Sequence, residues 1–431
     1  MTILQIKDTL FAQEIIQNRR VIATENRTVE ANVRTIINQV QAKGDAGLLE
    51  YTRKYDHVEL KKTDLQVAPQ TFSDAYDQVH RTEIAALMHL KKRIEQVEQR
   101  KLDQMHFSIQ EHGLEITHTT QPIESVGCYV PGGEAVYPST LLMTVLPAKI
   151  AKVPRIVVCS PPTTNGEINP LILVAASLCN VDEVYRLGGA QAIAALSYGT
   201  ESISPVRKIV GPGNIFVTIA KMLVSRDVAI DLPAGPSEIL VLADETANPK
   251  FIALDLISQA EHTADNIAGV VTTSRELAEN ICQEVEEIAP QSPRSQIVAN
   301  SLTHQGFIVC FKQMDDAIGF VNRFAPEHLE IHTRKPRQVA TQITSAGIVL
   351  VGEYTPVSVS DYCIGTNHVL PTAGSGHIYS ELSVLDYVKR INIVECSREK
   401  LRSLQRVTQT LAQSEGLVNH ARAIQGRFTD G

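Results

Sequence analysis

The spacing of apolar residues changes along the chain, and the change predicts two kinds of structure. The first ~120 residues favour helices, and Gly44 is placed to end one of them. The apolar residues of that helix recur every three or four positions: Val33, Ile36, Ile37 and Val40. A second helix, with a charged and solvated outer face, is predicted over 81–102.

From about residue 123, short β-branched runs alternate with helical stretches. Strands are predicted at 155–160, 183–187, 208–210 and 228–231, with helices near 170–180, 190–198 and 215–225. A second alternation places strands at 239–242, 270–273, 307–310 and 348–351, and a helical tail follows over roughly 384–425. Alternation at this spacing is typical of βαβ units and parallel sheets. The pattern therefore predicts an α/β protein with two doubly wound halves, a helical N-terminus and a helical tail.

Composition narrows the class of protein. A length of 431 residues exceeds one usual core, and 43% apolar with 20% charged residues is typical of a globular chain. A net charge of −8 argues against a nucleic-acid or acidic-membrane partner. The seven cysteines are scattered and include no CxxC pair, which indicates a reducing compartment. The N-terminus carries charges where a signal peptide would be apolar, and the apolar runs are too short to span a bilayer. We expect a cytoplasmic protein that binds neither nucleic acid nor membrane.

The segment FAPEHLE at 324–330 carries the strongest chemical signal. Glu327 and His328 are adjacent, and Pro326 favours the end of the preceding helix at Phe324. An imidazole takes and returns protons near neutral pH, and a neighbouring carboxylate can activate water. The alternative is an ordinary Glu-His pair on a surface helix. The other motifs of the chain favour catalysis.

Three glycine turns are candidates for binding a nucleotide. They are GCYVPGGEAVYPST at 127–140, with Tyr129 as a stacking or hydrogen-bonding group, LGGAQAIAAL at 187–196 and VGPGNIFV at 210–217. The last two join a strand to a helix N-terminus, a natural place for a pyrophosphate. Neither has the GxGxxG spacing, so tight turns that let helices pack closely remain the alternative.

Four residues form a candidate metal site with nitrogen and oxygen ligands. Gln259 and His262 are three apart in a helix-like stretch and would share one face, although such pairs also occur in ordinary helices. Asp361 lies in a loop rich in Gly, Asn and Pro, and His420 lies near the end of the chain. Either could equally be a solvated surface residue. Together they would carry one negative charge, so a bound Zn²⁺ would keep a net positive charge.

Nine segments together resemble the histidinol dehydrogenase family, in the family's order and spacing. They read YVPGG, YPST, GGAQAIAALSYGTESI, KIVGPGN, IDLPAGPSE, SQAEH, NRFAPEHLE, GTNHVLPT and EGLVNHARAI. One departure is Ser360, where the family usually has glycine, which could restrict the backbone beside Asp361.

The resemblance implies a fold and a division into domains. The fold would be two incomplete Rossmann-like, doubly wound domains with a helical N-terminal segment and a helical C-terminal tail. The N-terminal segment would be 1–25, and the first domain 26–125 with 237–380, carrying the Glu-His pair and most metal ligands. The second domain, 126–236, would bind NAD, and 381–431 would be a tail that crosses a homodimer.

The resemblance also implies residue roles in a four-electron oxidation of L-histidinol to L-histidine by two NAD⁺. The acid–base pair would be Glu327 and His328, and the zinc ligands Gln259, His262, Asp361 and His420. Substrate would contact these ligands together with Ser237, His328 and Glu415, and NAD would contact Tyr129, Gln191 and Asn214. Each site would take His420 and Glu415 from the other chain, although sequence leaves a within-chain site open. The rivals are a relative that oxidises another polar alcohol and an inactive binding protein.

Overall fold

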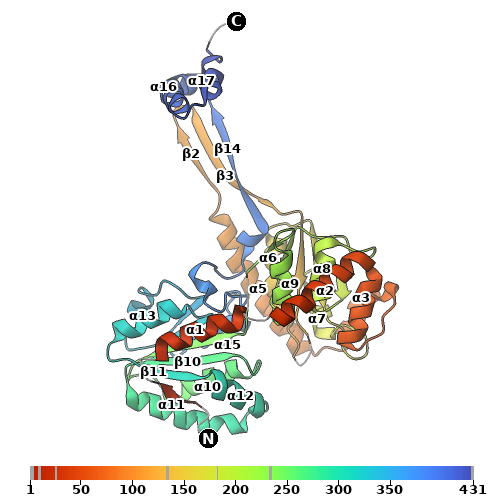
Figure 1. Ribbon diagram of the computed structural model, residues 1–431, viewed down its shortest axis with the longest axis vertical. Coiled ribbons are helices and arrows are strands. Elements are labelled where there is room, and N and C mark those ends of the chain that lie inside the picture. Colours follow the sequence, from red (N-terminus) through yellow and green to blue (C-terminus); the bar gives the residue numbers. More distant parts are fainter. Residues whose placement is uncertain are drawn as a thin grey trace.

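A computed structural model gives the arrangement of the chain as two lobes and a long arm (Figure 1). It describes residues 4–7, 11–24, 27–132, 135–181, 183–232 and 235–428. Gly133, Pro233 and Ala234 of the family motifs, and parts of the 1–25 segment, lie outside the described residues. Each lobe is built on a parallel sheet, which confirms the predicted α/β class.

The first lobe contains a six-stranded parallel sheet with helices on both faces. Its order is β1 (Ile6–Lys7), β11 (Phe307–Cys310), β10 (Ile267–Thr272), β9 (Glu238–Ala243), β12 (His328–His332) and β13 (Ile348–Val351). The helices α10 (Pro249–Ala260), α11 (Arg275–Ile288) and α12 (Ser295–Gln305) share one core with it. On the opposite face lie α1 (Phe11–Thr24), α13 (Met314–Phe324) and α14 (Pro336–Ala340). The strand order reverses between β9 and β12, so the sheet is doubly wound.

The second lobe contains a five-stranded parallel sheet. Its order is β6 (Glu183–Arg186), β5 (Arg155–Ser160), β4 (Ser125–Tyr129), β7 (Lys208–Val210) and β8 (Ala229–Ile230). One core joins it to α4 (Pro69–Tyr76), α5 (Arg81–Asp103), α6 (Pro138–Ile150) and α7 (Pro170–Leu178). The other core contains α2 (Arg27–Lys43), α3 (Asp45–Tyr51), α8 (Gly189–Tyr198) and α9 (Ile215–Val224).

The helices of residues 27–103 thus pack on the five-stranded sheet, whereas the sequence assigned 26–125 to the domain of 237–380. The reason is the apolar stripe of α2, whose buried Val33 and Ile36 belong to the same cluster as Ile193 of α8 and Val217 of α9. Only β1 and α1, from the N-terminal 24 residues, join the six-stranded sheet lobe. Amphipathic spacing predicted these helices but carried no information on which sheet they cover.

The arm is a three-stranded antiparallel sheet that ends in two helices (Figure 1). β3 (Leu114–Pro122) lies between β2 (Phe107–Glu111) and β14 (Val388–Cys396). Beyond them, α16 (Arg398–Ser414) and α17 (Val418–Gln425) form the far end. The sequence predicted the two helices, but it read the first ~120 residues as mostly helical and 381–431 as a helical tail. Strands β2, β3 and β14 were therefore missed.

The remaining short elements connect these parts. They are α15 (Val357–Tyr362), the π-helical turn 52–56 and the 3-10 turns 62–64, 289–291, 375–377 and 384–387. Among the residues that the structure describes, no helix is both long enough and apolar enough to cross a membrane.

Candidate active site

The Glu-His pair lies where α13 passes into β12. The helix ends at Phe324 as predicted, and Ala325 takes a left-handed conformation with φ 49° before Pro326. β12 then begins at His328, at the amino end of the six-stranded sheet. Glu327 and His328 are only 5% and 3% exposed. The pair is thus held inside the lobe and not on a surface helix.

Glu238, a residue that sequence reasoning missed, fixes the positions of both members of the pair. Its backbone N–H donates to Oε2 of Glu327 at 2.7 Å, and its carbonyl oxygen lies 3.0 Å from Nδ1 of His328. Because a carbonyl only accepts, this contact places the proton of a neutral imidazole on Nδ1 and leaves Nε2 as the basic nitrogen. The signal available was its place in IDLPAGPSE, directly after Ser237. Ser237 itself is partly exposed and directly precedes Glu238 in the chain.

Asp361 of α15 faces the free nitrogen of His328. Its Oδ1 lies 3.6 Å from Nε2, and both atoms are buried without a hydrogen-bond partner. Burial works to lower the pKa of His328, but the carboxylates of Glu327 and Asp361 outweigh it and raise that pKa well above its usual value. Burial works to raise the pKa of Asp361, yet the imidazoles of His328, His368 and His262 hold it below its usual value.

His262 approaches the same place from beyond the end of α10, close enough for its imidazole to lower the pKa of Asp361. Gln259 is 3% exposed in the last turn, and its carbonyl oxygen accepts a 2.8 Å hydrogen bond from Nδ2 of Asn266. His262 lies beyond the helix end, in a turn, so the two do not share a helix face as the sequence predicted. His262 lines a cavity together with Tyr137 and Tyr362, the residue that follows Asp361.

His368 is a second residue that sequence reasoning did not single out. Burial lowers its pKa against the attraction of Asp361, and its Nε2 lies 3.0 Å from Oγ1 of Thr140. The neighbouring Asn367 fixes the loop by donating from Nδ2 to the carbonyl oxygen of Met143 at 2.8 Å. The motif GTNHVLPT contained this histidine.

Ser360 causes no strain beside Asp361. It lies within α15 and its φ is not positive, so a glycine is not required there. Its hydroxyl donates to the carbonyl oxygen of Val357 at 2.7 Å, as serines in helices commonly do. The restriction expected from the sequence is therefore absent.

The three candidate cofactor residues lie at the carboxyl edge of the five-stranded sheet. Tyr129 ends β4, Gln191 lies in the first turn of α8 after β6, and Asn214 caps α9 after β7. The strand order reverses between β4 and β7, and ligands of doubly wound sheets bind at such switch points. Tyr129 is buried and its hydroxyl accepts from the backbone N–H of Gly189 at 3.1 Å. Asn214 is exposed, and its Oδ1 accepts from the backbone N–H groups of the first turn of α9.

Gly211 passes close beneath this edge. Its φ is 112°, and a Cβ there would lie 2.1 Å from the carbonyl oxygen of Tyr129. A buried ion pair of Lys221 and Asp231 holds its peptide groups from two sides. Lys221 Nζ donates to the carbonyl oxygen of Gly211 at 2.8 Å, and Oδ2 of Asp231 accepts from its N–H at 2.7 Å.

Glu415 and His420 lie away from all of these groups. Glu415 follows α16 and His420 lies in α17, both exposed at the far end of the arm (Figure 1). Within one chain the structure brings together Glu327, His328, Asp361 and His262. Gln259 lies in the last turn of α10, just before His262. The structure does not bring Glu415 or His420 to these groups.

Comparisons with known proteins agree on one family. The family model described as histidinol dehydrogenase matches residues 19–428. A histidinol dehydrogenase of Methanothermobacter thermautotrophicus is 44% identical over 92% of this chain and 93% of its own, and one of Bacillus cereus is 45% identical over 94% and 93%. The crystal structure of histidinol dehydrogenase from Elizabethkingia anophelis superposes with a TM-score of 0.93 at 34% identity, over 99% of this chain and 98% of that one.

Proposed function

Because the chain belongs to the histidinol dehydrogenase family, and is thus an oxidoreductase of histidine biosynthesis, we propose that it oxidises L-histidinol to L-histidine through L-histidinal with two NAD⁺. One observation carries this proposal. His328 is buried with Nδ1 on the carbonyl oxygen of Glu238, so that its unpartnered Nε2 faces the unpartnered Oδ1 of Asp361. A base in the correct tautomer therefore faces a candidate metal ligand.

In the first step His328 acts as the base. The alcohol loses its hydroxyl proton to Nε2 while a hydride passes from the carbinol carbon to the first NAD⁺, giving aldehyde and NADH. The Glu238 carbonyl oxygen stabilises the imidazolium, because it accepts a hydrogen bond from the N–H at Nδ1. Both groups lie inside the lobe, so bulk water does not compete for the base.

In the second step Glu327 serves the aldehyde. Its carboxylate takes a proton from a water that adds to the carbonyl carbon, and the hydrate then loses a hydride to a second NAD⁺ to give the carboxylic acid. The N–H of Glu238 holds Oε2 of Glu327 at 2.7 Å, which leaves Oε1 to accept from water. Holding the aldehyde between the steps protects a reactive amino aldehyde from solution.

Gln259, His262 and Asp361, with His420, would hold Zn²⁺. The residues fit the ion: they offer nitrogen and oxygen donors, and Oδ1 of Asp361 is buried without a hydrogen-bond partner. When bound, the ion supplies an electrophilic anchor for the nitrogens of the substrate and fixes its geometry. Glu415 would bind the far side of the substrate, and Ser237 would contact it beside Glu327.

The lobe of the five-stranded sheet would bind NAD⁺ at the β4–β7 switch point. Asn214 caps the helix that follows KIVGPGN, and the N-terminus of α8 presents backbone N–H groups beside Gln191. Tyr129 contributes by holding Gly189 through its hydroxyl. We also place the protein in the cytoplasm, since its seven cysteines are unpaired, as in a reducing compartment.

The arm would join two copies so that each site receives His420 and Glu415 from its partner. Its exposed surface is apolar on several elements: Phe107, Ile109, Ile391, Ile393, Val394, Val407, Leu411, Leu417 and Val418. A thin sheet and two helices cannot bury this surface themselves, and large exposed apolar patches mark protein interfaces. A second copy is the occupant that would also complete the metal site.

The reaction is tested by counting NADH formed per histidinol consumed, in holoenzyme and after chelation. We expect about two NADH per substrate, loss of turnover with chelator and recovery with Zn²⁺. One NADH per substrate with release of aldehyde, or no oxidation of histidinol while another polar alcohol is oxidised, would contradict the proposal. Full activity in rigorously metal-free protein would contradict the metal site.

The shared site is tested by mixing two inactive variants, Glu327→Gln and His420→Asn, under conditions that exchange subunits. If the tails act across the dimer, each mixed dimer has one site made wholly of unmutated parts. Random exchange then restores about a quarter of wild-type activity, because half of the dimers are mixed and half of their sites are intact. A mixture that stays inactive although mass spectrometry detects mixed dimers would place both residues within their own chain's site.

A further inference from the structure

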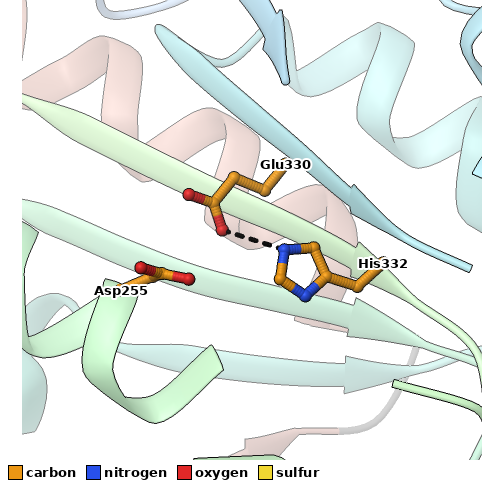
Figure 2. Close-up of side chains that lie close together, drawn as sticks. All are labelled: Asp255, Glu330 and His332. Atoms are coloured by element: carbon orange, nitrogen blue, oxygen red, sulfur yellow. Dashed lines mark ion pairs between the residues drawn. The ribbon is translucent and has the colours of Figure 1, made fainter. Parts of the chain in front are cut away.

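One face of β12 carries a second group of polar residues, toward the carboxyl end of the strand, whereas the catalytic pair lies at its amino end. His328, Glu330 and His332 alternate along the strand and so point to the same side of the sheet. Leu329 and Ile331 point to the opposite side, into the core with α13. The polar face is covered by α10, whose Asp255 reaches Glu330 and His332 (Figure 2).

These three side chains come together in the interior. One ligand atom from each of Asp255, Glu330 and His332 lies within 4.8 Å of the other two. Nε2 of His332 lies 3.3 Å from Oε2 of Glu330, and the side chains of the two residues are 1% and 0% exposed. Figure 2 shows the carboxylates and the imidazole directed toward one another.

Several of these atoms lack a partner. Oε1 of Glu330 accepts a 2.8 Å hydrogen bond from the backbone N–H of Val357, but Oε2 has none. Both ring nitrogens of His332 are also buried without a hydrogen bond. Buried polar atoms in folded proteins are nearly always satisfied, because each unsatisfied one is costly. The position of these atoms therefore points to a ligand between them.

The charge of the group leads to the same conclusion. Within the described part of the chain, the only basic group at ion-pair distance from Glu330 is His332, and Asp255 has none. Burial, together with the neighbouring carboxylate of Glu330, raises the pKa of Asp255 to about 8. Without an ion the two carboxylates therefore share a proton, which leaves the imidazole nitrogens of His332 unsatisfied, whereas a bound cation would replace that proton and engage the imidazole.

We propose that Asp255, Glu330 and His332 bind a divalent first-row metal ion, in a site that shares no residue with the catalytic zinc ligands. Two carboxylates and one neutral imidazole form a donor set that Zn²⁺ or Mn²⁺ accepts, and a charge of +2 neutralises the two carboxylates. The N–H of Val357 is the outer-shell donor that orients Glu330. Asp255 is the most exposed member and gives the ion its path of entry.

The distances fit such an ion after small side-chain rotations. Tetrahedral ligands with bonds of about 2.1 Å lie about 3.4 Å apart, close to the 3.3 Å between Nε2 of His332 and Oε2 of Glu330. Ligands of one ion are at most about 4.2 Å apart, so the 4.8 Å limit of the group must contract slightly. Asp255, the least buried of the three residues, is the member that would make this movement.

Such an ion would join the three elements that hold the catalytic groups. Asp255 lies one turn before Gln259 on α10, and Glu330 lies two residues after His328 on β12. Through Val357, Glu330 also holds the N-terminus of α15, which carries Asp361. The ion would be structural, and its loss would loosen these elements without removing any group that touches substrate.

Metal content separates this site from the catalytic one. The experiment compares four proteins: wild type, His262→Asn, His332→Asn and the double variant. Each protein is stripped with chelator, reloaded with Zn²⁺ or Mn²⁺ and desalted. Its metal content is then measured by inductively coupled plasma mass spectrometry. We expect about two ions per chain in wild type, about one in each single variant and none in the double variant. Added Zn²⁺ should also raise the melting temperature of His262→Asn but not of the double variant.

A second variant covers the possibility that His332→Asn does not fold. Glu330→Gln keeps an oxygen for the N–H of Val357 and removes the charge, so it should fold and bind about one ion fewer than wild type. If His332→Asn and Glu330→Gln bind as much metal as wild type, the proposal is overturned and the group holds a shared proton. A failure of the catalytic zinc site would instead appear as unchanged metal content in His262→Asn.

Discussion

The buried ion pair beneath the NAD edge gives a prediction whose size follows from the structure. Lys221 and Asp231 are 5% and 1% exposed, and they clamp the two peptide groups of Gly211. In Lys221→Met the ammonium is removed while the carboxylate of Asp231 stays buried. Breaking one side of a buried pair costs about 3–5 kcal/mol, because the remaining charge is uncompensated. That is a large part of the total stability of about 5–15 kcal/mol of an ordinary domain.

The double variant Lys221→Met/Asp231→Asn provides the matched control. Asparagine keeps an oxygen for the N–H of Gly211 and leaves no buried charge, so at least half of the loss should be recovered, about 2 kcal/mol. Urea unfolding followed by circular dichroism gives both values. Steady-state kinetics should show a higher KM for NAD⁺ in Lys221→Met, since the turn before Asn214 loosens, with little change in KM for histidinol.

Two results would refute this reasoning. A loss below about 1 kcal/mol in Lys221→Met would mean that the carboxylate is not buried and charged as the contacts require. A double variant no more stable than the single one would mean that the loss comes from packing of the lysine stem and not from the unpaired charge.

Three further outcomes are expected. Gly211→Ala should lose about 1–3 kcal/mol and bind NAD⁺ more weakly, because its Cβ would meet the carbonyl oxygen of Tyr129 at φ 112°; Gly319→Ala, in α13, is the control that should lose nothing. Glu327→Gln should slow oxidation of added histidinal more than the first hydride transfer in single-turnover experiments, and equal losses would contradict the assignment. In metal-stripped protein, Asp255→Asn should gain stability over wild type as pH rises from about 4 to 8, since only the unfolded wild-type chain ionises this carboxyl freely there. A difference that stays constant over that range in urea titrations would contradict the raised pKa of Asp255.

The parts of the fold that sequence predicted well are those with a single dominant local signal. The strands at 155–160, 208–210, 307–310 and 348–351 have the predicted bounds, because buried parallel strands are continuous apolar runs. The helix before Pro326 ends at Phe324 as predicted. The strand β12 was not predicted, although His328, Glu330 and His332 alternate with apolar residues as in a half-buried strand. In the structure every position of β12 is buried.

Long-range organisation left weaker signals. Strands β2 and β14 of the arm are exposed along most of their length and β3 is only partly buried, so the periodicity that a core imposes is absent. The family resemblance named the residues of the candidate site. Among them the structure brings Glu327, His328, Asp361 and His262 together. Tyr129, Gln191 and Asn214 lie at the edge of the other sheet. Sequence reasoning missed Glu238 because this residue contacts the pair through its backbone N–H and carbonyl groups, which any residue type has. It missed His368 because this histidine lies inside a motif already recognised and has no spacing signature of its own.

The pairing of β14 with β3 has a consequence for how the chain is made. Val388 pairs with Pro122 and Cys396 with Leu114, so most of the polypeptide is synthesised between the two strands. Both lobes can fold before β14 is available, and during that time the edge of β3 in the β2–β3 hairpin has no partner strand. Contacts between residues this distant in sequence also form slowly. An open edge is a template for wrong pairing. A chain cut short before Val388 would therefore keep both lobes, lack the tail, and be prone to aggregate through the unpaired edge of β3.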